Sequence, residues 1–229
     1  MKRLLLAGVV CAAGTVVLGG VGVGTNILRS PEELDSLRTL VNDAGAWEVL
    51  DRLAGKYAIW AVATEPDPAS GDPAVRLHHF DFGHREGRSS KLYRLTFRST
   101  ATGADGYHIA VQSGRFLRGA SPPRPATLAR ARELVVLRSL LNDETVVLEG
   151  AGASEREGAY NVLARCLETH AVQSVRIVLE DAEEEGEPEM TYAVIVTAVA
   201  PGKPVTTLRF RTLYEVATRS VGEFELLEG

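Results

Sequence analysis

The chain has 229 residues but only two cysteines, Cys11 and Cys166. Cys11 lies in an apolar N-terminal run, so Cys166 is the single cysteine of the remaining sequence. One cysteine cannot form an intramolecular disulfide, so we expect this part to be stabilised by core packing. No cysteines are paired at the spacing of a structural zinc site.

A basic excess and the motifs of common enzymes are also missing. The formal net charge is −5, which argues against general affinity for nucleic acid, because such binding needs a basic surface. The sequence has no glycine-rich phosphate loop with Lys-Ser/Thr, no G-x-S-x-G and no H-E-x-x-H. It therefore favours a binding or scaffold role, with no cofactor and no nucleic-acid partner, over catalysis.

The sequence does contain a long uncharged N-terminal run. Lys2 and Arg3 precede it, and no further charge occurs until Arg29. A cationic start followed by an apolar segment is typical of a signal peptide or signal-anchor, and this run is long enough to span a bilayer. We expect residues 1–29 to target the chain to the cell envelope. The remainder would be extracytoplasmic, either secreted or anchored to the membrane through residues 4–28.

One short stretch occurs twice. ELDSLRTLVND (residues 33–43) returns as ELVVLRSLLND (residues 133–143), with the Glu, three Leu, Arg, Asn and Asp identical. A weaker match relates residues 45–62 to residues 158–175, at a larger offset. Two matches in the same order predict an internal duplication with an insertion in the second copy. We expect the leucines in the core, the Asn-Asp at a helix end, and Arg38 and Arg138 in one shared structural task.

In each half, helical periodicity is followed by strand periodicity. Ser30, Pro31 and Glu33 form an N-terminal capping signal, and leucines at helical spacing follow it. A second capping signal, SERE, predicts a helix starting at Ser154. Alternating patterns predict strands over residues 56–64, 74–82, 91–99 and 106–113, and over 173–181, 190–200, 204–216 and 221–228.

This order of elements predicts an α+β fold of two similar units. Each unit would have one or two helices packed on a four-stranded antiparallel sheet, in the element order of cystatin-like and NTF2-like folds. The expected organisation is a signal or anchor (1–29), a first unit (30–117), a Pro-rich linker (118–126) and a second unit (127–229).

HHFDFGHREG (residues 78–87) is the richest concentration of chemically active side chains. On a strand, His79 and Asp81 share one face, and His84 follows shortly after. These three residues are a speculative metal site, since imidazole and carboxylate are common zinc ligands. The alternative is an ordinary strand with one polar face. If these residues bind a metal, the alternative to a binding or scaffold role is a metal-assisted hydrolase. A second alternative is a carrier of an apolar ligand between the two units.

A local resemblance involves residues 137–172. LRSLLNDETVVLEGAGASEREGAYNVLARCLETHAV is similar to the opening of phosphotransferase-system EIIA domains of the fructose/mannitol type. That resemblance would imply a phosphorylated histidine in a later segment. No histidine follows His170 in this chain, so phosphotransfer is not expected.

Overall fold

The computed structural model describes residues 16–18, 28–72, 74–86, 89–103, 106–117, 131–148, 154–181 and 189–228. The predicted linker, residues 118–126, lies outside them. Within some strands only the backbone is described, and this includes His84. The described chain forms an α+β structure with antiparallel sheets, which confirms the predicted fold class at that level.

The first half consists of two helices followed by a four-stranded antiparallel sheet. Its elements are α1 (Pro31–Asn42), α2 (Ala44–Ala54), β2 (Ala58–Pro66), β3 (Val75–Glu86), β4 (Ser89–Ala101) and β5 (Tyr107–Leu117). The strands pair in the order β2-β3-β4-β5, which is the local meander expected from the sequence.

The second half has the same order, with additions. Its elements are α3 (Ala131–Asn142), β6 (Val146–Leu148), β7 (Ser154–Arg156), α4 (Ala159–Leu167), β8 (Ala171–Asp181), β9 (Glu189–Val199), β10 (Thr206–Glu215), β11 (Ser220–Val221) and β12 (Glu225–Glu228). Strands β8, β9, β10 and β12 form the expected meander. This sheet has six strands, because β1 (Val16–Leu18) and β11 also pair with it.

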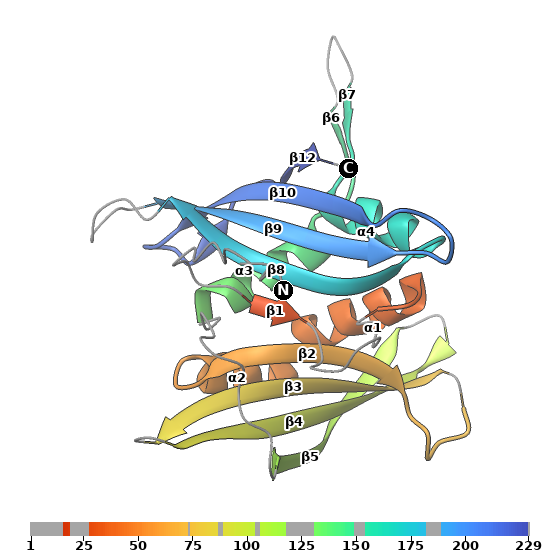
Figure 1. The fold of residues 1–229 in the computed structure, drawn as a ribbon, viewed down its shortest axis with the longest axis vertical. Coiled ribbons are helices and arrows are strands. Elements are labelled where there is room, and N and C mark those ends of the chain that lie inside the picture. Colours follow the sequence, from red (N-terminus) through yellow and green to blue (C-terminus); the bar gives the residue numbers. More distant parts are fainter. Residues whose placement is uncertain are drawn as a thin grey trace, which may run out of the picture.

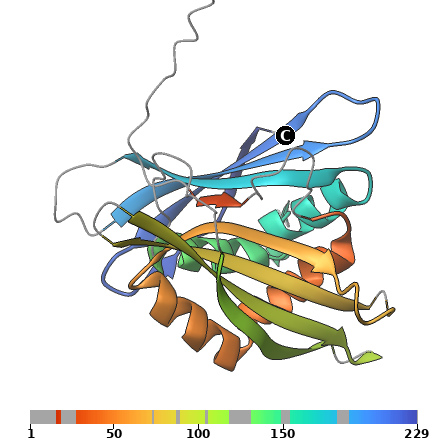
Figure 2. The ribbon, with the colours of Figure 1, turned by 60° about the horizontal axis from the view of Figure 1, so that its bottom comes forward.

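In Figure 1, α1 and α3 lie between the two sheets, whereas α2 lies behind the first sheet and α4 behind the second. Helices α1 and α2 contact the first sheet, whereas α3 and α4 contact the second, as the turned view also shows (Figure 2). The leucines of the repeated stretch, including Leu37, Leu40, Leu137 and Leu140, are all at most 3% exposed. They belong to one hydrophobic cluster that continues through both halves, so the two sheets share a single core.

The repeated Asn-Asp ends a helix in both halves, as expected. Helix α1 ends at Asn42 and α3 at Asn142. The aspartate that follows then caps the next helix: Asp43 Oδ1 accepts from Ala46 N at 2.8 Å, and Asp143 Oδ2 accepts from Ala159 N at 2.8 Å.

The predicted insertion in the second half is a projecting hairpin, β6–β7 (Figure 1). It lies between Asp143 and the helix that Asp143 caps. The prediction of a helix starting at Ser154 is wrong, because Ser154–Arg156 is a strand and α4 begins at Ala159. The local capping signal of SERE is not used there. Asp143 supplies the cap from across the hairpin instead.

Two parts of the expected leader contact the folded body. Strand β1 pairs antiparallel with β8 and lies between β8 and β2 (Figure 1). Leu28 forms an isolated antiparallel bridge with Val172 and is 5% exposed within the core cluster. Among the described residues, no helix has both the length and the apolar character needed to cross a bilayer.

Candidate functional site

The ends of α1 and α3 meet through the repeated asparagines. Asn42 Nδ2 donates to Asn142 Oδ1 at 2.7 Å, and Asn142 Nδ2 donates back to Asn42 Oδ1 at 3.1 Å. Each asparagine also accepts from the arginine of the other helix, Arg38 at 3.4 Å and Arg138 at 3.1 Å. The contact is therefore nearly two-fold symmetric, with the asparagine pair at its centre.

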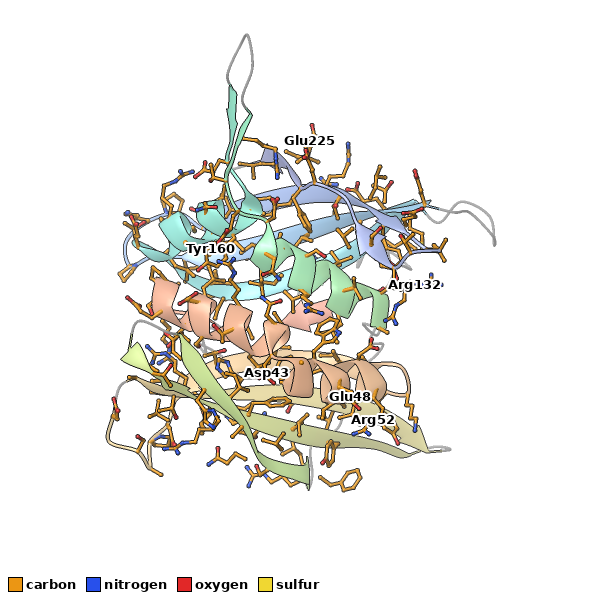
Figure 3. All side chains as sticks on the ribbon, turned by 180° about the vertical axis from the view of Figure 1, so that it is seen from behind. Asp43, Glu48, Arg52, Arg132, Tyr160 and Glu225 are labelled. Atoms are coloured by element: carbon orange, nitrogen blue, oxygen red, sulfur yellow. The ribbon has the colours of Figure 1, made fainter. Side chains whose placement is uncertain are left out.

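Each of these arginines stacks on an aromatic ring from the other half. The Arg38 guanidinium lies 4.5 Å from the centroid of Tyr160 on α4, and the Arg138 guanidinium lies 4.3 Å from that of Trp47 on α2. Trp47 and Tyr160 occupy matching positions of the weaker repeat. Figure 3 shows Tyr160 above α1 at this contact. The shared task of the repeated arginines is thus to join the two halves.

An open groove of about 450 Å³ lies beside the second of these stacks. Its lining comes from α1, α2, α3 and the turn before β11, and consists of Asn42, Trp47, Asp51, Val135, Arg138, Ser139, Asn142 and Arg219. Arg219 donates to Asp51 Oδ1 at 2.7 Å, which ties the turn to α2. The groove thus offers two guanidinium groups, one carboxylate, two amides, a hydroxyl and an indole ring. This combination suits recognition of a small polar ligand.

Arg219, which lines the groove, lies in the turn just before β11. Its φ is +55°, the left-handed region that few residues other than glycine adopt. The hydrogen bond to Asp51, with the attraction of that carboxylate, raises the pKa of Arg219, so this side chain stays charged.

His78 is sealed inside the first half and cannot serve a substrate from solvent. It is 0% exposed, on the helix-facing side of β3. Its Nε2 lies 2.9 Å from Ser99 Oγ and 3.3 Å from Ser36 Oγ, and its Nδ1 lies 2.9 Å from Thr64 Oγ1. Burial, with smaller contributions from His79 and Arg76, lowers the pKa of His78 to about 3. The imidazole is therefore a neutral core group.

The structure places His79 and Asp81 on the other face of β3, with separate partners. His79 Nδ1 lies 2.9 Å from Thr96 Oγ1, and its Nε2 lies 3.0 Å from Glu65 Oε1. Asp81 forms a two-point ion pair with Arg94, at 2.7 and 2.8 Å. Only the backbone of His84 is described, paired with Lys91. Among the described side chains, no three His, Cys, Asp or Glu residues converge as metal ligands would.

Two further positions bear on function. Burial raises the pKa of the Cys166 thiol, so this half-buried cysteine is a poor nucleophile.

The leucine-lined space between the helices, bounded by Leu34, Leu137 and Leu163 among others, measures about 20 Å³. That volume holds about one water molecule, so the shared core is filled there.

Comparison with protein-family models, with curated proteins and with solved structures finds no match to this chain. The cystatin-like or NTF2-like order of elements therefore stays a prediction.

The sequence led us to expect the contact surface on the sheet faces or in the cleft between the two units, but it did not predict which residues line this groove. Its signal was present in the recurrence of Arg38 and Arg138, which indicated a shared task. Trp47 and Arg219 gave no such signal, because they lie far from Arg138 in the sequence and meet it only through the packing of the two halves.

Proposed function

We propose that this protein is an extracytoplasmic, non-enzymatic binding or scaffold protein, and that the groove between its halves is its ligand site. The groove itself carries this proposal. Among the described residues, it is a hollow that combines room for a small molecule with charged, amide and aromatic groups. The expectation of an envelope location rests on the N-terminal run after Lys2 and Arg3.

The alternative functions have less support. A metal-assisted hydrolase using His79, Asp81 and His84 would need free ligand atoms, but His79 and Asp81 are engaged by Glu65 and Arg94. A carrier of an apolar ligand would need a large dry cavity, and the leucine-lined space is too small for one.

We also infer that the two halves arose by duplication. The support is that residues at the same position of the repeat have the same structural role. Asn42 and Asn142 pair with each other, and Asp43 and Asp143 each cap the next helix. In this account the β6–β7 hairpin is the insertion that changes the offset between the copies.

A ligand screen tests the site. Amide and indole signals of isotope-labelled protein would be followed by NMR while mixtures of small polar molecules are added. Binding at the groove predicts shifts at Trp47, Ser139 and Asn142. Shifts centred on His79 and Asp81, or zinc binding there that His79→Ala removes, would favour the hydrolase instead.

The location has its own test. A C-terminal alkaline phosphatase fusion is active only outside the cytoplasm, so the full-length fusion should be active and a fusion lacking residues 2–27 inactive. Activity of both fusions, or of neither, would contradict the envelope location.

A further inference from the structure

The two arginine–aromatic stacks differ sharply in their charged surroundings. Beside the first stack, Arg38 forms an ion pair with Glu144 at 2.6 Å, and the Tyr160 hydroxyl donates to Asp35 Oδ1 at 3.4 Å. One carboxylate therefore pairs with the guanidinium group of this stack, and a second accepts from its aromatic partner. Burial acts to lower the pKa of Arg38, but the contacts with Glu144 and Tyr160 raise it overall.

The second stack lacks both of these carboxylates. The repeat places Val135 where the first copy has Asp35, and Ala44 follows Asp43 where Glu144 follows Asp143. Within the described part of the chain, no carboxylate lies within ion-pair distance of Arg138. Its one described hydrogen bond is from Nε to Asn42 Oδ1, at 3.1 Å.

The groove occupies the space beside the Arg138 guanidinium group, for which the described residues supply no carboxylate partner. Val135 and Arg138 both line it, together with the Ser139 hydroxyl and the Asn142 amide. Asp51 is the single carboxylate in the lining, and it is engaged by Arg219. The groove therefore carries a local positive charge on a chain whose net charge is −5.

We propose that the groove binds a small organic carboxylate, whose carboxylate group pairs with Arg138 and so takes the role that Glu144 has beside Arg38. This proposal rests on the binding function proposed above. A planar carboxylate matches the geometry of a guanidinium group and forms charge-assisted hydrogen bonds with it. The Ser139 hydroxyl can donate to the same group or to a second polar group of the ligand. The volume of about 450 Å³ suits a molecule of metabolite size.

The test compares carboxylates with their neutral amides. Propionate and benzoate, propionamide and benzamide, and inorganic phosphate would each be titrated up to their solubility limits. The readouts are the Arg138 Nε–H and Trp47 indole signals in NMR spectra. The carboxylates should bind at least about tenfold more tightly than the amides, and binding should weaken as salt is added.

Two pairs of variants show where the carboxylate binds. Arg138→Gln should weaken carboxylate binding about tenfold or more, whereas Arg38→Gln, in the matching stack, should change it less than about twofold. Val135→Asp restores the carboxylate of the first copy and should weaken binding about tenfold relative to Val135→Asn. Asp and Asn have nearly the same size, so this second pair isolates charge from any loss of packing.

The possible failures are distinguishable. If the amides bind the groove as tightly as the carboxylates and Arg138→Gln has no effect, the carboxylate inference is wrong but the binding function stands. If phosphate binds Arg138 more tightly than either carboxylate, the ligand class is wrong. If no probe shifts the groove signals, the carboxylate inference fails, and the wider screen of polar molecules decides the binding function separately.

Discussion

The two halves begin with nearly the same eleven residues but differ where those residues end. In the first half Asp43 leads directly into the helix that it caps, and in the second a hairpin intervenes before Asp143 caps its helix. The hairpin side carries Glu144, which neutralises Arg38. On the other side, no described carboxylate forms an ion pair with Arg138, and there the groove lies next to this arginine.

The residues that the two copies share differ in role from those in which the copies differ. The shared residues, Asn42 with Asn142 and Arg38 with Arg138, hold the halves together in a nearly symmetric way. The residues that differ between the copies include Val135 in place of Asp35, and in our proposal these differences leave the side with Arg138 able to accept a ligand.

The largest effects are expected in the shared core. Leu37→Ala in α1 and Leu137→Ala in α3 should each cost about 2–5 kcal/mol of unfolding free energy, because both side chains are at most 3% exposed and border the same leucine-lined space. Denaturant unfolding followed by circular dichroism and by tryptophan fluorescence should give one transition for each variant. Two separate transitions would show that the halves have independent cores.

Matched glycines of the repeat should respond differently. A Cβ at Gly158 would lie 2.1 Å from the backbone oxygen of Asp143, so Gly158→Ala should cost about 3 kcal/mol. A Cβ at Gly45 would meet only Asp43 Oδ1, at 3.4 Å, so Gly45→Ala should change stability by less than about 1 kcal/mol. Urea denaturation measures both. Equal costs would show that the hairpin does not bring the backbone so close to Gly158.

The buried His78, for which the second half has no matching histidine, should make stability depend on pH. The pKa of His78 is about 3 in the folded protein, against about 6.5 in an unfolded chain. At pH values between these two pKa values, His78 is therefore protonated in the unfolded state but neutral in the folded state. The stabilisation is complete above pH 6.5 and declines as the pH falls towards 3. Between pH 7 and pH 5 the loss should be about 2 kcal/mol, measured by urea unfolding.

The control is His78→Gln, which keeps hydrogen-bonding capacity but cannot titrate in this range. It should lack this part of the pH dependence. An NMR titration of the wild-type His78 ring provides a second check, and a ring that titrates near pH 6.5 would contradict the burial of this residue.

The smallest difference concerns the two arginines. Arg38→Ala should cost about 1 kcal/mol, because it removes the stack on Tyr160 and leaves Glu144 unpaired. Arg138→Ala should cost about 0.5 kcal/mol, since Arg138 has no carboxylate partner among the described residues. Thermal unfolding resolves this difference. A larger loss of unfolding free energy for Arg138→Ala than for Arg38→Ala would contradict this expectation and would indicate an ion pair of Arg138.

Local patterns were sufficient to predict most of the elements. The leucine spacing predicted α1 and α3, and alternation predicted each strand of the two meanders. The helix start at Ser154 was wrong because a cap can come from outside its own segment, as Asp143 shows. The polar surroundings of His78 could not be predicted, since Ser36, Thr64 and Ser99 reach it from three different elements. The groove likewise depends on how α2 and the Arg219 turn pack, which no local pattern records.

We propose that the Arg38 stack is closed by a carboxylate and that the Arg138 stack is open to a ligand. The most direct measurement follows the side-chain Nε–H signals of Arg38 and Arg138 in one NMR titration with propionate. The predicted result is a saturable shift of the Arg138 signal with the Arg38 signal unchanged. Equal shifts of both signals, or a shift of Arg38 alone, would contradict the claim.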